Sequence, residues 1–381
     1  MKNLNSKLPQ IGESIFATMT KMANDYNAIN LSQGFPDFNC SDELLERVAY
    51  YQSKGFNQYA PMPGVLNLRK KISEKIEKIY GRRYNPDTEI VVTAGGTQAL
   101  YTAITAVVST GDEVIILEPA YDSYAPAVLI NGGVPIYISL SKKDYSIDWD
   151  KVEKAISEKT RLIIINSPHN PTGSVLSEND VTILEKIIRN KSIYLISDEV
   201  YEHIIFDDKK HYSFSQSPEL SERSFVISSF GKTYHTTGWK VGYCVAPEIL
   251  MKEFKKVHQF IVFAVNTPIQ HAYADIMENE EMYLGLNKFY QQKRDFMVSL
   301  LRKSRFKFNP AQGTYFQLLD YSSISDLNDR EFSEYLTKEI GVAVIPLSPF
   351  YSNGSDDKVI RICFAKKEEV LQAAAEKLCQ V

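Results

Sequence analysis

The chain has 381 residues and a formal net charge of −4; 44% of its residues are hydrophobic and 24% are charged. This length exceeds what one compact core usually holds, so two domains, or one large domain with an appendage, are expected. The slightly acidic balance argues against nucleic acid as the main partner, because binding to phosphates needs a basic face.

Several other functional classes lack their sequence signals. No apolar run reaches the roughly 18 residues of a membrane-spanning helix, so we expect no membrane partner. The N-terminal stretch MKNLNSKLPQIGESIF lacks the apolar segment of a signal peptide, and we expect a cytoplasmic protein. The four cysteines form no CxxC motif, which argues against a disulfide framework or a zinc site. The six histidines show no HExxH spacing, so no metal is expected.

Short apolar runs alternate with helical patterns from roughly residue 90 to residue 245. Several runs are almost wholly apolar and β-branched, which is typical of strands covered on both faces. This pattern predicts an α/β fold with a mostly parallel central sheet and flanking helices. The predicted strands are EIVVTAG (89–95), EVIILEP (113–119), VPIYISL (134–140), RLIIINSP (161–168), IYLISDEV (193–200), SFVISSF (224–230) and VGYCVAP (241–247).

Helices are predicted between these strands at ALYTAITAVV (99–108), YAPAVLIN (124–131), DKVEKAIS (150–157) and ENDVTILEKIIRN (178–190). Ser177 stands where an N-cap of the last helix is needed. After residue 250 the chain becomes helix-rich. The segment 251–279 breaks at Asn266-Thr267-Pro268, and the segment 283–304 predicts one long helix before a separate αβ segment. We expect a large domain over 46–285 and a smaller α/β domain from 1–45, with an N-terminal arm, and 286–381.

The ends of the predicted strands carry polar groups, and open parallel sheets bind ligands beyond the carboxyl ends of their strands. Gly95-Gly96-Thr97-Gln98 follows the first strand and precedes a helix. Glycines allow a close backbone approach, and a helix N-terminus suits a phosphate. The alternative is a simple turn.

Asn170 lies in the rigid turn SPHNPTG, where it can serve as a fixed donor and acceptor or belong only to a structural turn.

Two ionisable residues follow buried strands. Asp198 comes directly after IYLIS, and a buried acid needs a cation or several donors; the alternative is an N-cap for a following helix. Lys232 follows FVISSF, where a lysine facing a cleft can lose its proton and form a Schiff base, or can form a salt bridge. Ser229 and Lys240 can hold a phosphate or be ordinary loop residues. Together these groups suit a pyridine aldehyde phosphate.

The motifs NSPHNPTG, SDEVYEHIIF and SSFGKTYHTTGWKVGY, in this order, resemble those of class I, fold-type-I pyridoxal-phosphate-dependent aminotransferases. The likeness runs from LSQGFPDF to VIRICFA. It is strongest to the branch of kynurenine aminotransferase, glutamine transaminase K and bacterial methionine aminotransferase. The segments HQFIVFAVNTPIQ and 313–351 especially resemble the methionine-preferring members. The resemblance implies pyridoxal 5'-phosphate as cofactor, bound by the large domain, and a homodimer with a shared active site.

The resemblance also implies individual roles. Lys232 matches the lysine that attaches the cofactor covalently, and Asp198 the acid that pairs with its ring nitrogen. Asn170 and Tyr201 match the pair that contacts its phenolic oxygen. Tyr121 matches the aromatic ring stacked on the pyridine; the alternative is an ordinary half-buried tyrosine. The residues that match the phosphate cup are Gly96, Thr97, Ser229 and Lys240. Many members carry arginine in place of Lys240, whereas the kynurenine-type branch resembles this chain in having lysine.

The resemblance gives roles to three further residues that lie outside the loops at the strand ends. Tyr59, in NQYAPMPGVLNLR, matches a tyrosine that reaches the phosphate of the neighbouring subunit. Arg361 matches the arginine that binds the substrate α-carboxylate, assisted by the backbone of Gly34; the alternative is a buried structural ion pair. Asn170 and Tyr121 complete the substrate-binding set.

The expected activity is transfer of the α-amino group of methionine or an aromatic amino acid to a 2-oxo acid by a ping-pong route. The catalytic residues are Lys232, which moves the proton, Asp198 and Tyr201. The aromatic-rich side-chain pocket is expected to include Ile11, Phe16, Phe263, Tyr315 and Phe350. The alternatives are a cysteine-S-conjugate β-lyase, a kynurenine-preferring aminotransferase, or a regulator that carries this domain. A dehydrogenase lacks its glycine fingerprint.

Overall fold

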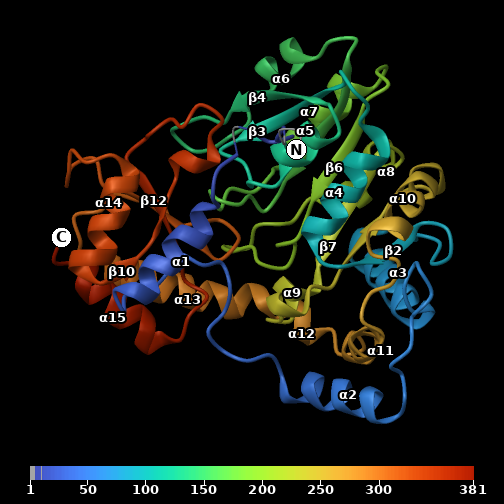
Figure 1. Cartoon of the computed structure of the whole chain (residues 1–381), viewed down its shortest axis with the longest axis horizontal. Helices are drawn as coiled ribbons and strands as arrows, with labels where there is room; N and C mark the ends of the chain where they lie inside the picture. The colour runs from blue at the N-terminus through green and yellow to red at the C-terminus, as the bar shows by residue number, and fades with distance from the viewer. Residues whose placement is uncertain (1–4, 10) are drawn as a thin grey trace.

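The computed structural model describes residues 5–9 and 11–381 and contains a central sheet covered by helices (Figure 1). The seven strands of this sheet have the order β2-β8-β7-β6-β5-β3-β4. All neighbours pair in parallel except β8, which is antiparallel to β2 and to β7. The predicted strands and the mostly parallel sheet are therefore confirmed. The bounds are β2 Ile90–Thr93, β3 Glu113–Glu118, β4 Val134–Ser139, β5 Thr160–Asn166, β6 Tyr194–Asp198, β7 Ser224–Ser229 and β8 Gly242–Val245.

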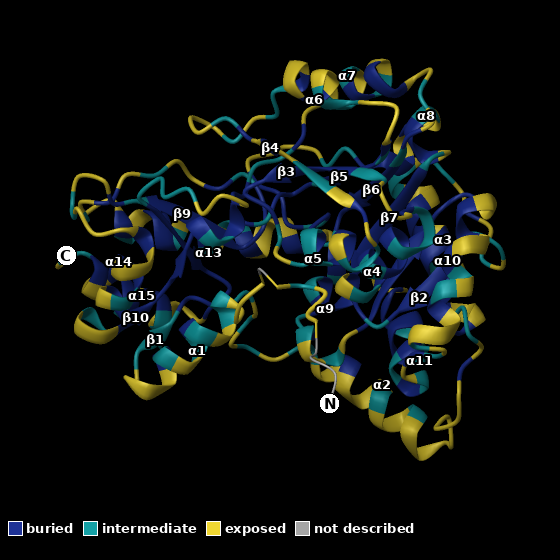
Figure 2. Ribbon diagram, turned by 45° about the horizontal axis from the view of Figure 1, so that its top comes forward, coloured by how far each residue is buried: buried dark blue, intermediate teal, exposed yellow. Residues whose placement is uncertain are grey.

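The apolar runs lack alternation because both faces of the sheet are buried. In β3, Ile115 and Leu117 belong to the core on one face, whereas Val114 and Ile116 belong to the core on the other. Successive side chains of a strand point to opposite faces, so a strand between two helical layers needs apolar residues at every position. Figure 2 shows the corresponding exposure pattern, with exposed outer faces on the surrounding helices α2, α6 and α7.

Two groups of helices cover the sheet. One core contains residues of α4 Gly96–Val107, α5 Tyr124–Ile130 and α10 Glu248–Ile261. The core on the other face includes residues of eight helices: α2 Asp42–Ser53, α3 Leu66–Tyr80, α6 Trp149–Ala155, α7 Glu178–Ile188, α8 Pro218–Ser221, α9 Phe230–Thr233, α11 Thr267–Ile276 and α12 Glu281–Leu284. The four helices expected between the strands are thus present as α4, α5, α6 and α7.

A separate three-stranded antiparallel sheet, β11-β12-β9, lies in the C-terminal part of the chain. A second buried core joins its strands to the C-terminal helices. The N-terminal helix α1 Ile15–Asp25 packs here too, and β1 Ile29–Asn30 pairs in parallel with β10 Val342–Ala343. The remaining bounds are α13 Leu286–Leu301, β9 Phe316–Asp320, α14 Asp329–Tyr335, β11 Ile345–Pro346, β12 Val359–Cys363 and α15 Glu368–Leu378.

The helices after residue 250 follow the expectation with one difference. The break expected at Asn266-Thr267-Pro268 lies between α10 and α11, and the Asn266 side chain caps α11 by accepting a hydrogen bond from the backbone of Ile269. The single helix expected over 283–304 is instead α12 Glu281–Leu284 followed by α13. Gly285 separates the two, as fits a residue of low helix propensity.

The division into domains at 45/46 and 285/286 stays a prediction. It is supported by the position of α13, whose first residue, Leu286, is already part of the core around the three-stranded sheet. Among the described residues, no helix has both the length and the apolar composition needed to cross a membrane.

The capping of α7 yields a stability prediction. The Ser177 side chain accepts a hydrogen bond from the Asp180 backbone, and the Asp180 side chain accepts one from the Ser177 backbone. The change Ser177→Ala removes half of this capping box and should lower the free energy of unfolding by about 1 kcal/mol. Urea denaturation followed by circular dichroism measures the loss. Thr182→Ala, at an exposed position of the same helix, is the control and should not lower the free energy of unfolding. Equal free energies of unfolding for the two variants would contradict the capping role.

Candidate active site

A cavity of about 150 Å³ lies at the carboxyl ends of the central strands. Nine of the residues predicted for the site line it: Gly96, Thr97, Tyr121, Asn170, Asp198, Tyr201, Ser229, Lys232 and Lys240. They come from the segments that follow β2, β3, β5, β6 and β7. Because β5, β6 and β7 are adjacent and parallel, their carboxyl ends meet at one edge of the sheet, which is where such sheets bind ligands.

Asp198 is the last residue of β6 and is almost fully buried. Its Oδ2 accepts a hydrogen bond of 2.6 Å from the Tyr124 hydroxyl, and its Oδ1 accepts one of 3.4 Å from the backbone of Val200. Burial raises the pKa of the Asp198 carboxyl to about 6. A turn follows Asp198, so the alternative of a helix N-cap is wrong.

Lys232 lies on the short helix α9, directly after β7. Its Nζ donates hydrogen bonds to the carbonyl oxygen of Gly34 at 3.1 Å and to the hydroxyl of Tyr315 at 2.8 Å. Both partners are neutral oxygens, so the alternative of a salt bridge is not realised among the described residues. Burial is the main cause that lowers the pKa of the Lys232 amine to about 8. The amine and the Asp198 carboxyl thus line one cavity without a direct ion pair.

The part of the cavity lining around Gly95 is suited to an anion. Gly95 has a φ of +82°, which glycine adopts without strain, and α4 begins at the next residue, Gly96. The ammonium of Lys240 lies beside this turn, since a Cβ added to Gly95 would be 3.3 Å from its Nζ. The Thr97 hydroxyl lies 3.1 Å from that of Tyr121. A positively charged group therefore stands next to the free N–H groups of a helix N-terminus.

Arg361 is held beside the cavity. Its NH1 donates a hydrogen bond of 2.7 Å to Oδ1 of Asn170, and its NH2 donates one of 3.2 Å to the carbonyl oxygen of Ser32. The guanidinium lies 3.8 Å from the ring centre of Phe316, and burial lowers its pKa to about 10. Both polar partners are neutral, so the alternative of a structural ion pair is not realised. Its Nε is buried and has no hydrogen-bond partner among the described residues.

Tyr59 does not line the cavity of its own chain. Its side chain is 84% exposed, and its ring packs edge-on against Phe263, which is also exposed. Tyr201, in contrast, is buried, and its ring packs edge-on against Tyr315 with 5.2 Å between the ring centres. Gly34 is joined to the site through its carbonyl oxygen, which contacts Lys232.

Three contacts were missed from the sequence. Tyr124 was assigned only to a helix, although its hydroxyl binds Asp198. Tyr315 was expected only as a pocket aromatic, yet its hydroxyl contacts Lys232. Ser32 carries no sequence signal, although its carbonyl oxygen helps to hold Arg361. For Tyr124 a signal existed, because it follows Tyr121 by only three residues in EPAYDSYAP, and the two rings pack edge-on with 5.7 Å between their centres.

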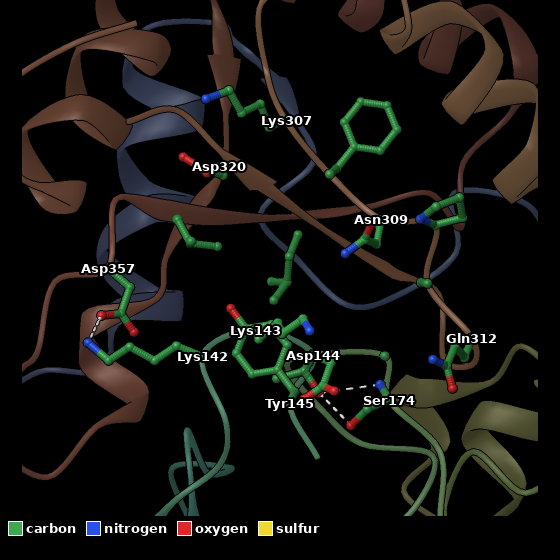
Figure 3. A pocket seen from close by; sticks show the side chains of 17 residues that line it. Lys142, Lys143, Asp144, Tyr145, Ser174, Lys307, Asn309, Gln312, Asp320 and Asp357 are labelled. Carbon is green, nitrogen blue, oxygen red and sulfur yellow. Dashed lines mark hydrogen bonds and ion pairs between the residues drawn. The ribbon is translucent and has the colours of Figure 1, made fainter. Parts of the chain in front are cut away.

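A larger cleft of about 550 Å³ lies elsewhere, between the loop after β4 and the segment before β9 (Figure 3). Its charged side chains come from Lys142, Lys143, Asp144, Lys307, Asp320 and Asp357, and Lys142 forms an ion pair with Asp357. None of the predicted site residues lines this cleft. The smaller cavity therefore remains the candidate active site, because the reactive groups converge on it.

Comparison with known proteins agrees with this geometry. Residues 26–378 match the family model described as aminotransferase class I and II. Methionine aminotransferase of Escherichia coli K12 is 52% identical over 377 residues, which cover 99% of this chain and 98% of that protein. Kynurenine–oxoglutarate transaminase of Dictyostelium discoideum is 34% identical and covers 97% and 94%, respectively.

A solved structure is also similar to this chain in fold and sequence. The crystal structure of YbdL from Escherichia coli, described as having a methionine aminotransferase function, has a TM-score of 0.97 and 51% identity, and each chain is covered completely. Enzymes of this family act on amino acids and 2-oxo acids, and they generally depend on pyridoxal phosphate. The chain belongs to the class I and II aminotransferases, with a fold-type-I architecture, and is an enzyme of the transaminase class.

Proposed function

We propose that this enzyme transfers the α-amino group of methionine or of an aromatic amino acid to a 2-oxo acid by a ping-pong route, with pyridoxal 5'-phosphate bound in the cavity. The observation that carries the proposal is the pairing of a buried amine, Lys232, with a buried carboxyl, Asp198, in one cavity. A covalent aldehyde cofactor with a basic ring nitrogen needs both groups.

The residues present fit this cofactor. Lys232 would attach its aldehyde, Asp198 would hold its ring nitrogen protonated, and the turn at Gly96 with Lys240 would bind its phosphate. The charges of the site also suit the cofactor. The anion site suits its phosphate and the Asp198 carboxyl suits its ring nitrogen, and both line the same cavity from different strand ends. When bound, the cofactor supplies an electron sink for the charge that develops at the substrate Cα.

The remaining cavity residues have supporting roles in this proposal. Asn170 and Tyr201 would contact the cofactor's phenolic oxygen, and the ring of Tyr121 would stack on its pyridine. Asn170 and Tyr121 would also contact the substrate. Thr97 and Ser229 would complete the phosphate cup. All five line the cavity, which supports these assignments.

Lys232 moves the proton in this proposal. Its amine, once free, accepts a proton from the substrate Cα and later returns one, which requires a group that can exist in both forms near neutral pH. A pKa of about 8, caused mainly by burial, meets this requirement better than that of a solvated lysine. The catalytic residues are Lys232, Asp198 and Tyr201.

Arg361 binds the substrate α-carboxylate. Its guanidinium is already fixed by Asn170 and Ser32, so little conformational freedom is lost when the substrate binds. No described residue uses the Nε–H of Arg361, and the planar guanidinium is suited to two parallel hydrogen bonds to a carboxylate. The backbone of Gly34 lies in the same region, since its carbonyl oxygen contacts Lys232. In this proposal it helps Arg361 to bind the α-carboxylate.

The surroundings of Arg361 support an apolar substrate side chain. Phe16 and Phe350 pack edge-on, with 5.9 Å between their ring centres, and each ring centre lies 5.3 Å from the guanidinium carbon. Flexible thioethers and aromatic rings make favourable contacts with such rings. The similarity to a methionine aminotransferase points to the same substrate class. Two further residues expected in the pocket, Ile11 and Phe263, are exposed in the single chain.

We also propose a cytoplasmic homodimer in which Tyr59 reaches the phosphate site of the neighbouring subunit. The exposed aromatic pair of Tyr59 and Phe263, with exposed Phe260 and Ile261 nearby in sequence, supports an apolar surface that a second copy covers. The four cysteines are all unpaired, as is usual in a reducing compartment.

A kynurenine-preferring aminotransferase is a second candidate, favoured by the similarity to kynurenine–oxoglutarate transaminases. Cysteine-S-conjugate β-lyase activity is a third, because removal of the Cα proton serves both outcomes. Pyruvate and ammonia formed from a cysteine conjugate without a 2-oxo acid acceptor would identify the lyase.

A donor panel tests the proposed activity. With a mixture of 2-oxo acids as acceptors, we expect kcat/KM for methionine and phenylalanine to exceed that for aspartate at least about tenfold, since the pocket beside Arg361 is apolar. Lys232→Ala should lower kcat by about 10³-fold or more, because the proton carrier is lost. Lys143→Ala, which changes an exposed lysine of the larger cleft, is the matched control. Normal turnover of Lys232→Ala would refute the assignment.

The hydrogen bond from Tyr124 to Asp198 yields a pH prediction. This bond favours the ionised carboxylate and lowers its pKa, so Tyr124→Phe should raise the pKa of Asp198. The acidic limb of the kcat/KM profile should then move to higher pH, with a loss of about tenfold near pH 6.

Tyr137→Phe is the control for this change, because Tyr137 lies on an exposed part of β4. The pH profile of each variant is measured against that of the unchanged protein. Identical profiles for both variants would show that Tyr124 does not tune Asp198.

A further inference from the structure

Tyr315 contacts the nitrogen that carries the reaction. It is fully buried just before β9, in the C-terminal part of the chain, whereas Lys232 follows β7 of the central sheet. Its hydroxyl lies 2.8 Å from Nζ of Lys232 and 2.5 Å from the carbonyl oxygen of Gly34. The Lys232 amine also lies over the faces of the Tyr201 and Tyr315 rings, 5.5 and 5.3 Å from their centres.

The directions of these hydrogen bonds follow from the atoms available. A carbonyl oxygen can only accept, so the single hydroxyl proton of Tyr315 is donated to Gly34. The hydroxyl oxygen is then left to accept from the amine of Lys232. Burial raises the pKa of the Tyr315 hydroxyl well above its usual value, which keeps it neutral. The amine is therefore held by two oxygens of fixed orientation, one of a side chain and one of the backbone.

We propose that Tyr315 is a positioning residue, whose hydroxyl holds the free amine of Lys232 in a defined position while that amine exchanges protons with the substrate. This inference rests on the proposed role of Lys232. A lysine side chain has four rotatable carbon bonds, so a released amine without a fixed partner samples many positions. Fixing the amine keeps it within reach of the reacting carbon, which is the requirement for efficient proton transfer.

Tyr290 provides a matched control. It is as buried as Tyr315, its ring centre is 5.7 Å from that of Tyr315, and its hydroxyl has no hydrogen-bond partner among the described residues. Tyr315→Phe and Tyr290→Phe therefore remove the same atom from neighbouring positions in the same core. Only the first change removes a contact with Lys232.

Two measurements on the full-length chain test the proposal. In the holoenzyme, Tyr315→Phe should lower kcat about tenfold and leave KM for the amino acid within about threefold, because one hydrogen bond to a charged group is lost. In the cofactor-free protein, acylation of Lys232 is followed against pH by peptide mass mapping. Loss of the acceptor disfavours the charged amine, so its pKa should fall by about one unit. Tyr290→Phe should change neither quantity.

Two results would overturn the proposal: a Tyr315→Phe enzyme with the kcat of Tyr290→Phe, or an unchanged pKa of Lys232 in the cofactor-free protein. The second readout does not involve catalysis, so it separates failure of this inference from failure of the proposed function. If Tyr315→Phe folds poorly, as judged by thermal denaturation, 3-fluorotyrosine at position 315 keeps the hydroxyl and makes it a weaker acceptor. The pKa of Lys232 should then also fall, and no shift would contradict the proposal.

Discussion

Two ionisable side chains are buried at one end of the central sheet, and the rest of the site is organised around the cost of burying them. The amine of Lys232 and the carboxyl of Asp198 are each removed from water, and each has a pKa moved toward neutrality by that burial. Hydroxyl groups and backbone atoms stabilise both groups, and neither forms a direct ion pair. Burying two ionisable groups without pairing them lowers the stability of a protein. Groups of this kind are therefore found mainly where a ligand interacts with them.

The fold makes this arrangement possible through strand order. β6 and β7 are adjacent and parallel, so Asp198 at the end of one and Ser229 at the end of the other lie at the same edge. Lys232 follows Ser229 by three residues and lies on the short helix α9. The C-terminal part of the chain adds Arg361 from β12 and the hydroxyl of Tyr315, so the cavity is lined by one sheet and completed by residues beside the other.

Much of this could be predicted from the sequence, for identifiable reasons. The seven strands were predictable because their apolar runs are short and nearly continuous, as burial on both faces demands. Asp198 was identifiable because it ends such a run, and Lys232 and Asn170 because they follow such runs within four residues. Arg361 drew attention as a charge inside an apolar strand, although its partners could not be predicted, because Asn170 is 191 residues away.

The contacts that escaped prediction all join distant segments through single atoms. Tyr124 and Asp198 are 74 residues apart, and Tyr315 and Lys232 are 83 residues apart. Tyrosines are numerous in this chain, and most serve the core, so a hydroxyl with a special partner cannot be distinguished by residue type. The break at Gly285 was missed for a different reason, because the apolar periodicity continues through it and only the weak propensity of glycine signals the end of α12.

The central claim is that Lys232 is the residue that carries the cofactor. The most direct measurement is reduction of the purified full-length protein, loaded with pyridoxal phosphate, with borohydride, followed by mass mapping of its peptides. We expect one pyridoxyl label, on Lys232. A label on another lysine of the cavity, such as Lys240, or an active protein that takes no label, would contradict it.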